Sequence, residues 1–140
     1  MIYLPDTNCF SAYFSNKSPA LSERLNREMA AGKLVLSVMV LAELEFGAFK
    51  AQEVLGTRRF LETVAKLKES LPPEPLEEDF VYHYSRTRHL LESQGNKIGD
   101  RDLIIASHGL ALGATVITRN VREFQRVPEL KVENWQTELG

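Results

Sequence analysis

Short apolar runs alternate along this chain with segments whose apolar residues recur at helical spacing, and this alternation constrains the fold most. The apolar runs lie at residues 2–5, at 34–38 ("LVLSV") and at 114–118 ("ATVIT"), and 130–135 ("LKVENW") form a further candidate edge strand. Strands separated by helices indicate an α/β fold with a mainly parallel sheet covered by helices on both faces. In such sheets the carboxyl ends of the strands carry the ligand sites.

The intervening segments carry helix signals of their own. Ser18 is a candidate N-cap, Pro19 stands in the first turn and Gly32 follows the last turn. Three prolines in "SLPPEPLEED", residues 70–79, forbid a continuous helix and predict a connection with one short strand. No repeat or linker divides the chain, so we expect a single domain over residues 1–140. The predicted helices span residues 18–31, 38–48, 52–68, 77–94 and 102–112.

Composition excludes several classes of protein. The formal charge is −2, which gives no overall attraction to nucleic acid or membrane but leaves room for a local basic patch. Cys9 is the single cysteine, so no intrachain disulfide can form and a reducing, cytoplasmic location is expected. No apolar run approaches the roughly 18 residues of a membrane span.

Oxygen-bearing side chains follow several of the predicted strands. Asp6 ends the first strand, and the strand at 34–38 leads into a helix that carries Glu43 and Glu45. The turn "IGDRD" places Asp100 and Asp102 before another helix. Carboxylates gathered in one place repel one another unless a cation compensates, and carboxylate oxygens suit Mg²⁺ or Mn²⁺. The pattern therefore predicts a divalent metal site.

Each of these acids also has a purely structural interpretation. Asp6 would make a good N-cap for a following helix, as would Asp100 or Asp102. Helical periodicity does not distinguish Glu43 from Glu45, because both flank the apolar stripe at similar angles. The metal-site hypothesis therefore rests on the joint pattern of acids.

Three segments together resemble the PIN-domain ribonucleases, in particular the VapC-type toxins of toxin–antitoxin pairs. They are "YLPDTNCFS", "LSVMVLAELEFGA" and "IGDRDLIIASHGLALGATVITRNVREFQRVPELKVENW". The resemblance implies a PIN-like three-layer α/β/α domain and assigns Asp6, Glu43 and Asp102 as metal ligands. The fourth catalytic position of the family corresponds to Asn120, which removes a charge. The resemblance implies supporting roles for four further residues: Thr7, Asn8, Asp100 and Thr118.

The same resemblance implies an Mg²⁺- or Mn²⁺-dependent endoribonuclease toxin that is neutralised by a VapB-type antitoxin and forms a homodimer. Structured transfer RNA is a plausible substrate. An RNA-binding or scaffold module without nuclease activity is the alternative, and Asn120 keeps it open. A structure-selective DNA nuclease is a third hypothesis that the short chain disfavours. The basic residues expected to bind RNA are Lys97, Arg101, Arg119, Arg122 and Arg126.

Apolar residues are abundant in the two middle helices. We expect most of them to lie in the core, and the resemblance implies that some form a homodimer face and a groove for a VapB-type antitoxin helix. Trp135 is expected to anchor the last strand. The apolar residues in question are Phe46, Phe49, Leu55, Phe60, Leu61, Val64 and Leu67.

Overall fold

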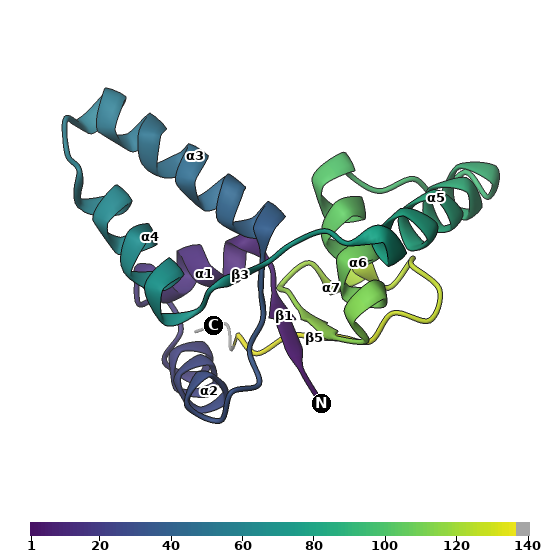
Figure 1. Ribbon diagram of the computed structural model, residues 1–140, viewed down its shortest axis with the longest axis horizontal. Helices are drawn as coiled ribbons and strands as arrows, with labels where there is room; N and C mark the ends of the chain where they lie inside the picture. Colours follow the sequence, from purple (N-terminus) through teal and green to yellow (C-terminus); the bar gives the residue numbers. More distant parts are fainter. Residues whose placement is uncertain (137–140) are drawn as a thin grey trace.

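A computed structural model, described for residues 1–136, confirms the α/β prediction (Figure 1). Strands β1 (Tyr3–Pro5), β4 (Thr115–Ile117) and β5 (Val132–Glu133) form a parallel sheet in the order β1-β4-β5. Strand β2 (Leu36–Ser37) pairs in parallel with β3 (Pro73–Glu74), the short strand predicted in the proline-rich connection. The predicted final strand is an edge strand.

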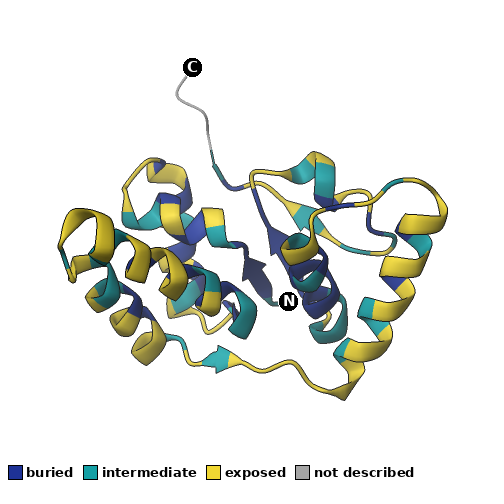
Figure 2. Ribbon diagram, turned by 90° about the horizontal axis from the view of Figure 1, so that it is seen from above, coloured by how far each residue is buried: buried dark blue, intermediate teal, exposed yellow. Residues whose placement is uncertain are grey.

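The two sheets meet next to Tyr3. Its N–H donates to the carbonyl of Lys33 and its own carbonyl accepts from the N–H of Val35, both at 2.8 Å. A parallel bridge to Leu34 completes this contact. The strands therefore run in the order β3-β2-β1-β4-β5, with parallel pairing throughout, and helices flank them on both sides (Figure 2).

Helix boundaries follow local signals at several places. The side chain of Ser18 accepts from the N–H of Leu21 and caps α2, and Gly113 ends α6 at φ +65°. That left-handed conformation suits glycine, which has no Cβ to clash. The helices are α1 (Thr7–Phe14), α2 (Pro19–Ala30), α3 (Val38–Leu55), α4 (Arg59–Ser70), α5 (Glu78–Ser93), α6 (Asp100–Leu112) and α7 (Val121–Phe124).

The predicted boundary between the two middle helices is wrong. Helix α3 continues to Leu55 and ends at Gly56, which adopts φ +68°, so residues 52–55 belong to α3. The far part of α3 projects beyond the sheet and pairs with α4 as an arm (Figure 1). Phe46, Phe49 and Leu55 are consequently 64%, 55% and 67% exposed, so they belong to the part of the apolar set that was expected outside the core.

The core lies between the strands and the inner faces of the helices, as the burial colours in Figure 2 show. Gly109 lets α6 approach β4 closely, because a Cβ there would lie 2.9 Å from Cγ2 of Val116. Trp135 is 8% exposed and packs edge-to-face on Tyr3 at 4.9 Å, which confirms it as an anchor for the end of the chain. None of the helices in residues 1–136 is long and apolar enough to span a membrane.

Candidate active site

Asp6 lies at the carboxyl end of β1, directly before α1. Its N–H donates to the carbonyl of Ile117 on the neighbouring strand at 2.9 Å, which fixes its backbone. Oδ1 accepts from the N–H of Cys9 at 2.9 Å, and Oδ2 accepts from the hydroxyl of Thr118 at 2.6 Å. Asp6 is therefore an N-cap, as its structural interpretation predicted. It is 4% exposed, and burial raises its pKa although these hydrogen bonds work against the rise.

Glu43 is selected over Glu45 by its neighbours. Oε1 of Glu43 accepts from the hydroxyl of Thr7 at 2.7 Å, and Oε2 lies 3.6 Å from Nη1 of Arg101. Its side chain is 16% exposed, whereas Glu45 is an exposed residue of the same helix. The Arg101 side chain is 69% exposed, so solvent screens this ion pair.

Asp102 stands in the first turn of α6, after the N-cap residue Gly99, which has no side chain to cap with. The prediction that Asp100 or Asp102 caps this helix is therefore wrong. The pKa of Asp102 is raised to about 7, first by burial and then by its hydrogen bond to Glu123 and by the charge of that residue. The charges of Asp6 and Glu43 raise this pKa further.

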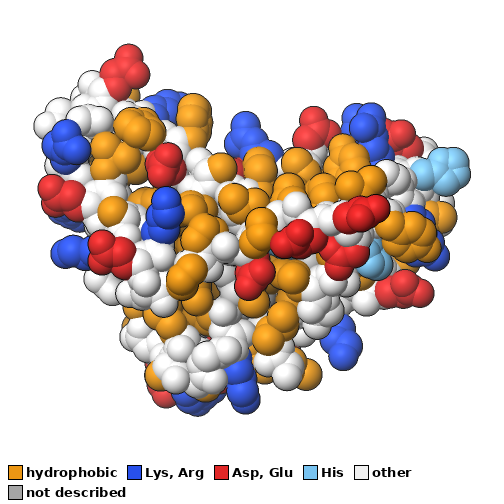
Figure 3. Space-filling model, in the orientation of Figure 1, with side chains coloured by type: hydrophobic (Ala, Val, Ile, Leu, Met, Phe, Trp, Pro, Cys, Tyr) orange, Lys and Arg blue, Asp and Glu red, His pale blue; other side chains and the backbone are white. Residues whose placement is uncertain are grey.

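The three acids open into one depression between α1, α3 and α6, with a volume of about 330 Å³. We call it the acid pocket. Figure 3 shows the molecular surface hollowed between the arm of α3 and α4 and the helices α5 and α6. Six of the residues predicted from the sequence line this pocket: Asp6, Thr7, Asn8, Glu43, Arg101 and Asp102.

Glu123 is a site residue that the sequence analysis missed. Its Oε1 accepts from the N–H of Gly99 at 2.7 Å, its Oε2 accepts from the side-chain amide of Asn120, and it bonds to Asp102. Burial alone would raise the pKa of Glu123, but the hydrogen bonds from Gly99, Asp102 and Asn120 outweigh it and lower the pKa. A carboxylate thus lies beside Asn120, and the Asn120 side chain donates a hydrogen bond to it.

The signal for Glu123 was present in the sequence. Asn120 is the N-cap residue of α7 and Glu123 lies three residues later, the spacing of a helix start in which an acid returns to the cap. The backbone N–H of Asn120 also donates to the hydroxyl of Thr118 at 2.9 Å. Thr118 therefore connects Asp6 to the turn that carries Asn120 and Glu123, a supporting position like the predicted one.

The remaining predicted residues are dispersed. Asp100 is exposed and, with Lys97, lines a shallow depression separate from the acid pocket. The carbonyl of Lys97 accepts from Nη1 of Arg126 at 3.1 Å, so those two basic residues are neighbours. Arg119 lies in a different groove on the other side of α1, and Arg122 is exposed on α7. The predicted basic cluster is thus divided into separate sites.

The donor set fits a divalent cation in its chemistry. Carboxylates are hard oxygen ligands suited to Mg²⁺ or Mn²⁺, and burial together with mutual repulsion raises the pKa of Asp6 and Asp102. Within residues 1–136, however, no three Asp, Glu, His or Cys side chains are grouped so that they could hold an ion between them. Asp6, Glu43 and Asp102 each have a protein hydrogen-bond partner, and an ionised carboxylate has about four lone-pair sites, so these bonds leave lone pairs for an ion.

Comparison with known proteins independently supports the resemblance to PIN-domain ribonucleases. The PIN domain pattern matches residues 3–130. The chain is 36% identical over 135 residues to Ribonuclease VapC1 of Haemophilus influenzae and 37% identical over 141 residues to Ribonuclease VapC2 of Rickettsia felis. Each alignment covers 96% of this chain and 98% of the relative. It is 30% identical to the tRNA(fMet)-specific endonuclease VapC of Salmonella typhimurium, over 95% of this chain and 97% of that protein.

Solved structures agree with the sequence relatives. The VapBC2 structure from Rickettsia felis, bound to a DNA fragment from its promoter, contains a chain that matches with a TM-score of 0.84 at 31% identity, covering 97% of this chain and 100% of that one. The VapBC-1 structure from nontypeable Haemophilus influenzae matches with a TM-score of 0.82 at 33% identity, covering 96% and 98%. The chain belongs to the PIN domain family, among the relatives named VapC.

Proposed function

We propose that this chain is an Mg²⁺- or Mn²⁺-dependent endoribonuclease of the VapC type. The single observation that carries the proposal is that Asp6, Glu43 and Asp102, from three separate elements, line one pocket. The relatives named ribonucleases and endonucleases support RNA as the substrate, and the tRNA(fMet)-specific relative makes transfer RNA the first candidate to test.

Asp6, Glu43 and Asp102 are the residues that would hold the cation. When bound, it would supply positive charge for the phosphate and make a water molecule more acidic. The hydrogen bonds from Cys9 and Thr118 orient Asp6 and favour its ionised form. Glu123 hydrogen-bonds to Asp102 through a carboxylate that the N–H of Gly99 stabilises.

The alternative of a binding module without nuclease activity depended on Asn120, which lacks a charge. Glu123 weakens that argument, because its carboxylate bonds to both Asn120 and Asp102. A fourth acid therefore contacts Asp102 from outside the lining of the acid pocket, and the geometry favours the nuclease.

Cleavage of total cellular RNA by the purified chain, in Mg²⁺, in Mn²⁺ and in EDTA, tests the proposal. Glu43→Gln should abolish discrete metal-dependent fragments. Glu45→Gln, a matched change on the exposed side of the same helix, should leave them unchanged. Cleavage that survives EDTA or Glu43→Gln would refute the assignment.

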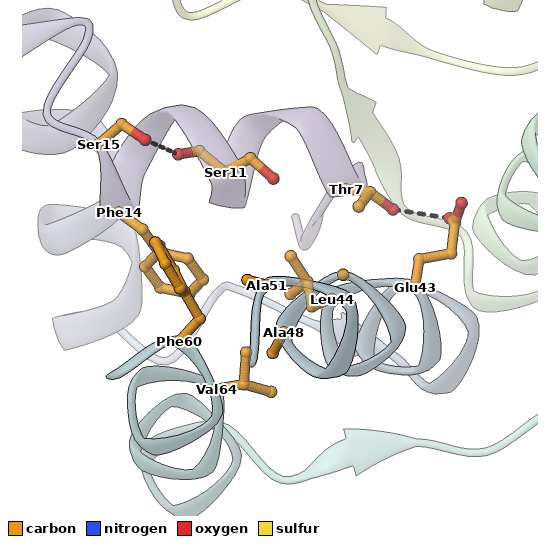
Figure 4. Close-up of a pocket in the computed structure, with 11 residues that line it drawn as sticks. Thr7, Ser11, Phe14, Ser15, Glu43, Leu44, Ala48, Ala51, Phe60 and Val64 are labelled. Atoms are coloured by element: carbon orange, nitrogen blue, oxygen red, sulfur yellow. Dashed lines mark hydrogen bonds between the residues drawn. The ribbon is translucent and has the colours of Figure 1, made fainter. Parts of the chain in front are cut away.

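We also infer a VapB-type antitoxin as partner. An apolar groove of about 250 Å³ lies between α1, α3 and α4, and at one end it reaches Thr7 and Glu43 (Figure 4). A protein segment seated there would block access to Glu43, which is how binding would neutralise the enzyme. Structures of VapBC complexes containing similar chains support this partner. Ala51→Arg should weaken neutralisation by a co-expressed antitoxin and leave cleavage intact. Undiminished neutralisation would exclude the apolar groove as the antitoxin-binding site.

A homodimer is part of the same proposal. Val81 and Tyr82 on α5 are 58% and 62% exposed, an apolar surface separate from the apolar groove. Sedimentation equilibrium should give twice the chain mass, and a monomer at all concentrations would refute the dimer.

A further inference from the structure

A second groove, polar and basic, adjoins the acid pocket on the other side of α1. Its volume is about 220 Å³, and it shares Asn8 and Ser11 with the acid pocket, so the two depressions are adjacent. Among residues 1–136, no carboxylate lines it. We call it the basic groove. Its polar lining consists of Asn8, Ser11, Ser15, Lys17, Arg119 and Gln136.

Helix α1 supplies one wall of the basic groove. Asn8, Ser11 and Ser15 recur at spacings of three and four residues, which places them along one face of the helix. Lys17 follows the helix, and its N–H donates to the carbonyl of Ala12 at 3.1 Å, so its backbone is held against the helix end. The Lys17 ammonium forms no ion pair with a carboxylate anywhere in the described part of the chain.

Arg119 supplies the opposite wall from the turn after β4. It stands between Thr118, whose hydroxyl donates to Asp6, and Asn120, whose N–H donates to that same hydroxyl. The Arg119 guanidinium is thus carried by the turn that also positions Asp6. The sign of charge changes from negative to positive over the short distance from the acid pocket into the basic groove.

The third depression around α1 has the opposite character. The apolar groove is lined mainly by Phe14, Ala48, Phe60 and similar side chains, and Glu43 is its charged lining residue. It shares Ser11 and Ser15 with the basic groove, and Thr7 is its other hydroxyl-bearing lining residue. A polyanion whose reacting phosphate lies in the acid pocket therefore finds cations and hydrogen-bonding groups on one side of α1 and an apolar surface with a carboxylate on the other. These properties distinguish the two possible paths for an RNA strand.

We propose that the basic groove binds the RNA backbone phosphate next to the one that is cleaved, through Lys17 and Arg119, with Asn8 and Ser11 hydrogen bonding to the sugar–phosphate chain. This inference rests on the proposed nuclease function and gives the strand a path out of the acid pocket. Phosphate contacts of this kind position the substrate and do not select its sequence.

Lys17→Ala tests the groove, with Lys33→Ala as the matched control. The Lys33 carbonyl pairs with the start of β1, at the end of the strand opposite Asp6. The substrate is a single-stranded oligoribonucleotide that spans the cleavage site mapped in total RNA. For Lys17→Ala, KM should rise roughly three- to fivefold with kcat nearly unchanged, as expected for one exposed charge contact. The slope of log KM against log salt should flatten by about 0.7, the value for one phosphate contact to a single strand.

Substrates that carry one neutral methylphosphonate locate the contact. At one position beside the scissile phosphate, the substitution should raise KM for the wild-type protein and for Lys33→Ala but have no further effect on Lys17→Ala. Lys17→Arg should restore the wild-type behaviour, which a loss of folding would not allow.

Two results would refute the inference or its foundation, and they differ. Unchanged KM and salt slope in an active Lys17→Ala protein would refute RNA binding by the basic groove without contradicting the nuclease function. Absence of Glu43-dependent cleavage in the wild-type protein would refute the nuclease itself, before the groove is tested.

Discussion

Replacing Asp102 by Asn should stabilise the folded protein at alkaline pH, because the carboxylate is held where its charge is unfavourable. Its pKa is raised from 3.8 to about 7, chiefly by burial and by Glu123. At about 1.36 kcal/mol per pH unit, this difference corresponds to about 4 kcal/mol. The residue is only half-buried, and solvent screening reduces the expected effect to about 2 kcal/mol.

The sign of the pH dependence follows from proton binding. Between pH 4 and pH 7 the folded protein retains the Asp102 proton that the unfolded chain has released, so stability falls as pH rises through this range and is constant above it. The lowered pKa of Glu123 acts in the opposite sense, and its contribution is lost only as the pH falls below about 4.5. The raised pKa of Asp6 and the lowered pKa of His108 contribute to both proteins, so the difference between Asp102→Asn and wild type at about pH 5 and about pH 8.5 isolates Asp102.

Urea unfolding in EDTA at those two pH values measures the effect. Asp102→Asn should exceed the wild-type unfolding free energy by about 2 kcal/mol at the higher pH, equivalent to about 6 °C in Tm, and by much less at the lower pH. Asp100→Asn, an exposed neighbour, should change stability by less than about 0.5 kcal/mol at either pH. The reasoning would be refuted if Asp102→Asn were no more stable than wild type at the higher pH. It would also be refuted if the gain in unfolding free energy over wild type were the same at both pH values.

Adding a divalent metal ion extends the same unfolding experiment. Saturating Mg²⁺ or Mn²⁺ should stabilise the wild-type protein, by about 2.7 kcal/mol at a hundredfold excess over Kd. The ion should stabilise Asp102→Asn less, because one ligand has lost its charge. Equal stabilisation of both proteins would place the ion elsewhere.

Three further changes follow from individual contacts. Glu123→Gln should lower cleavage at least about tenfold, because Asp102 and the N–H of Gly99 lose a charged partner; activity within threefold of wild type would remove Glu123 from the site. Thr118→Val deletes the 2.6 Å hydrogen bond that favours ionised Asp6, so the pKa of the Asp6 carboxyl, followed by NMR in EDTA, should rise by roughly one pH unit, and an unmoved pKa would contradict this role. Gly109→Ala places a Cβ 2.9 Å from the Val116 side chain and should lower the free energy of unfolding by about 1–3 kcal/mol in thermal melts, whereas an unchanged Tm would show that α6 can move away from β4.

The parts of the fold that could be predicted from sequence are those fixed by local chemistry. Ser18 caps α2 and Gly113 ends α6 because a side-chain oxygen and a left-handed glycine act within one helical turn. The strand positions followed from apolar runs, and Asp6 and Asp102 from their places beside them. The parts that could not be predicted depend on contacts between distant segments.

Glu43 and the end of α3 illustrate this limit. Periodicity placed Glu43 and Glu45 on equivalent flanks, and the decision comes from Thr7 and Arg101, which approach from α1 and α6. Apolar spacing suggested a helix break before residue 52, yet α3 runs on to Leu55 because its far end packs against α4. In both cases the deciding neighbour lies on another element, and spacing within one segment carries no information about it.

The two interpretations of Asp6, helix cap and metal ligand, are compatible because a carboxylate has two oxygens and a fixed direction. Capping through Oδ1 ties Asp6 to the first turn of α1, where the helix dipole favours negative charge. The Thr118 hydroxyl on Oδ2 draws the same side chain toward the turn that holds Asn120 and Glu123. Both bonds favour the ionised form against the burial that raises its pKa. The cap therefore favours the charged form of a buried acid and fixes its position at the end of a strand, and a metal ligand requires both.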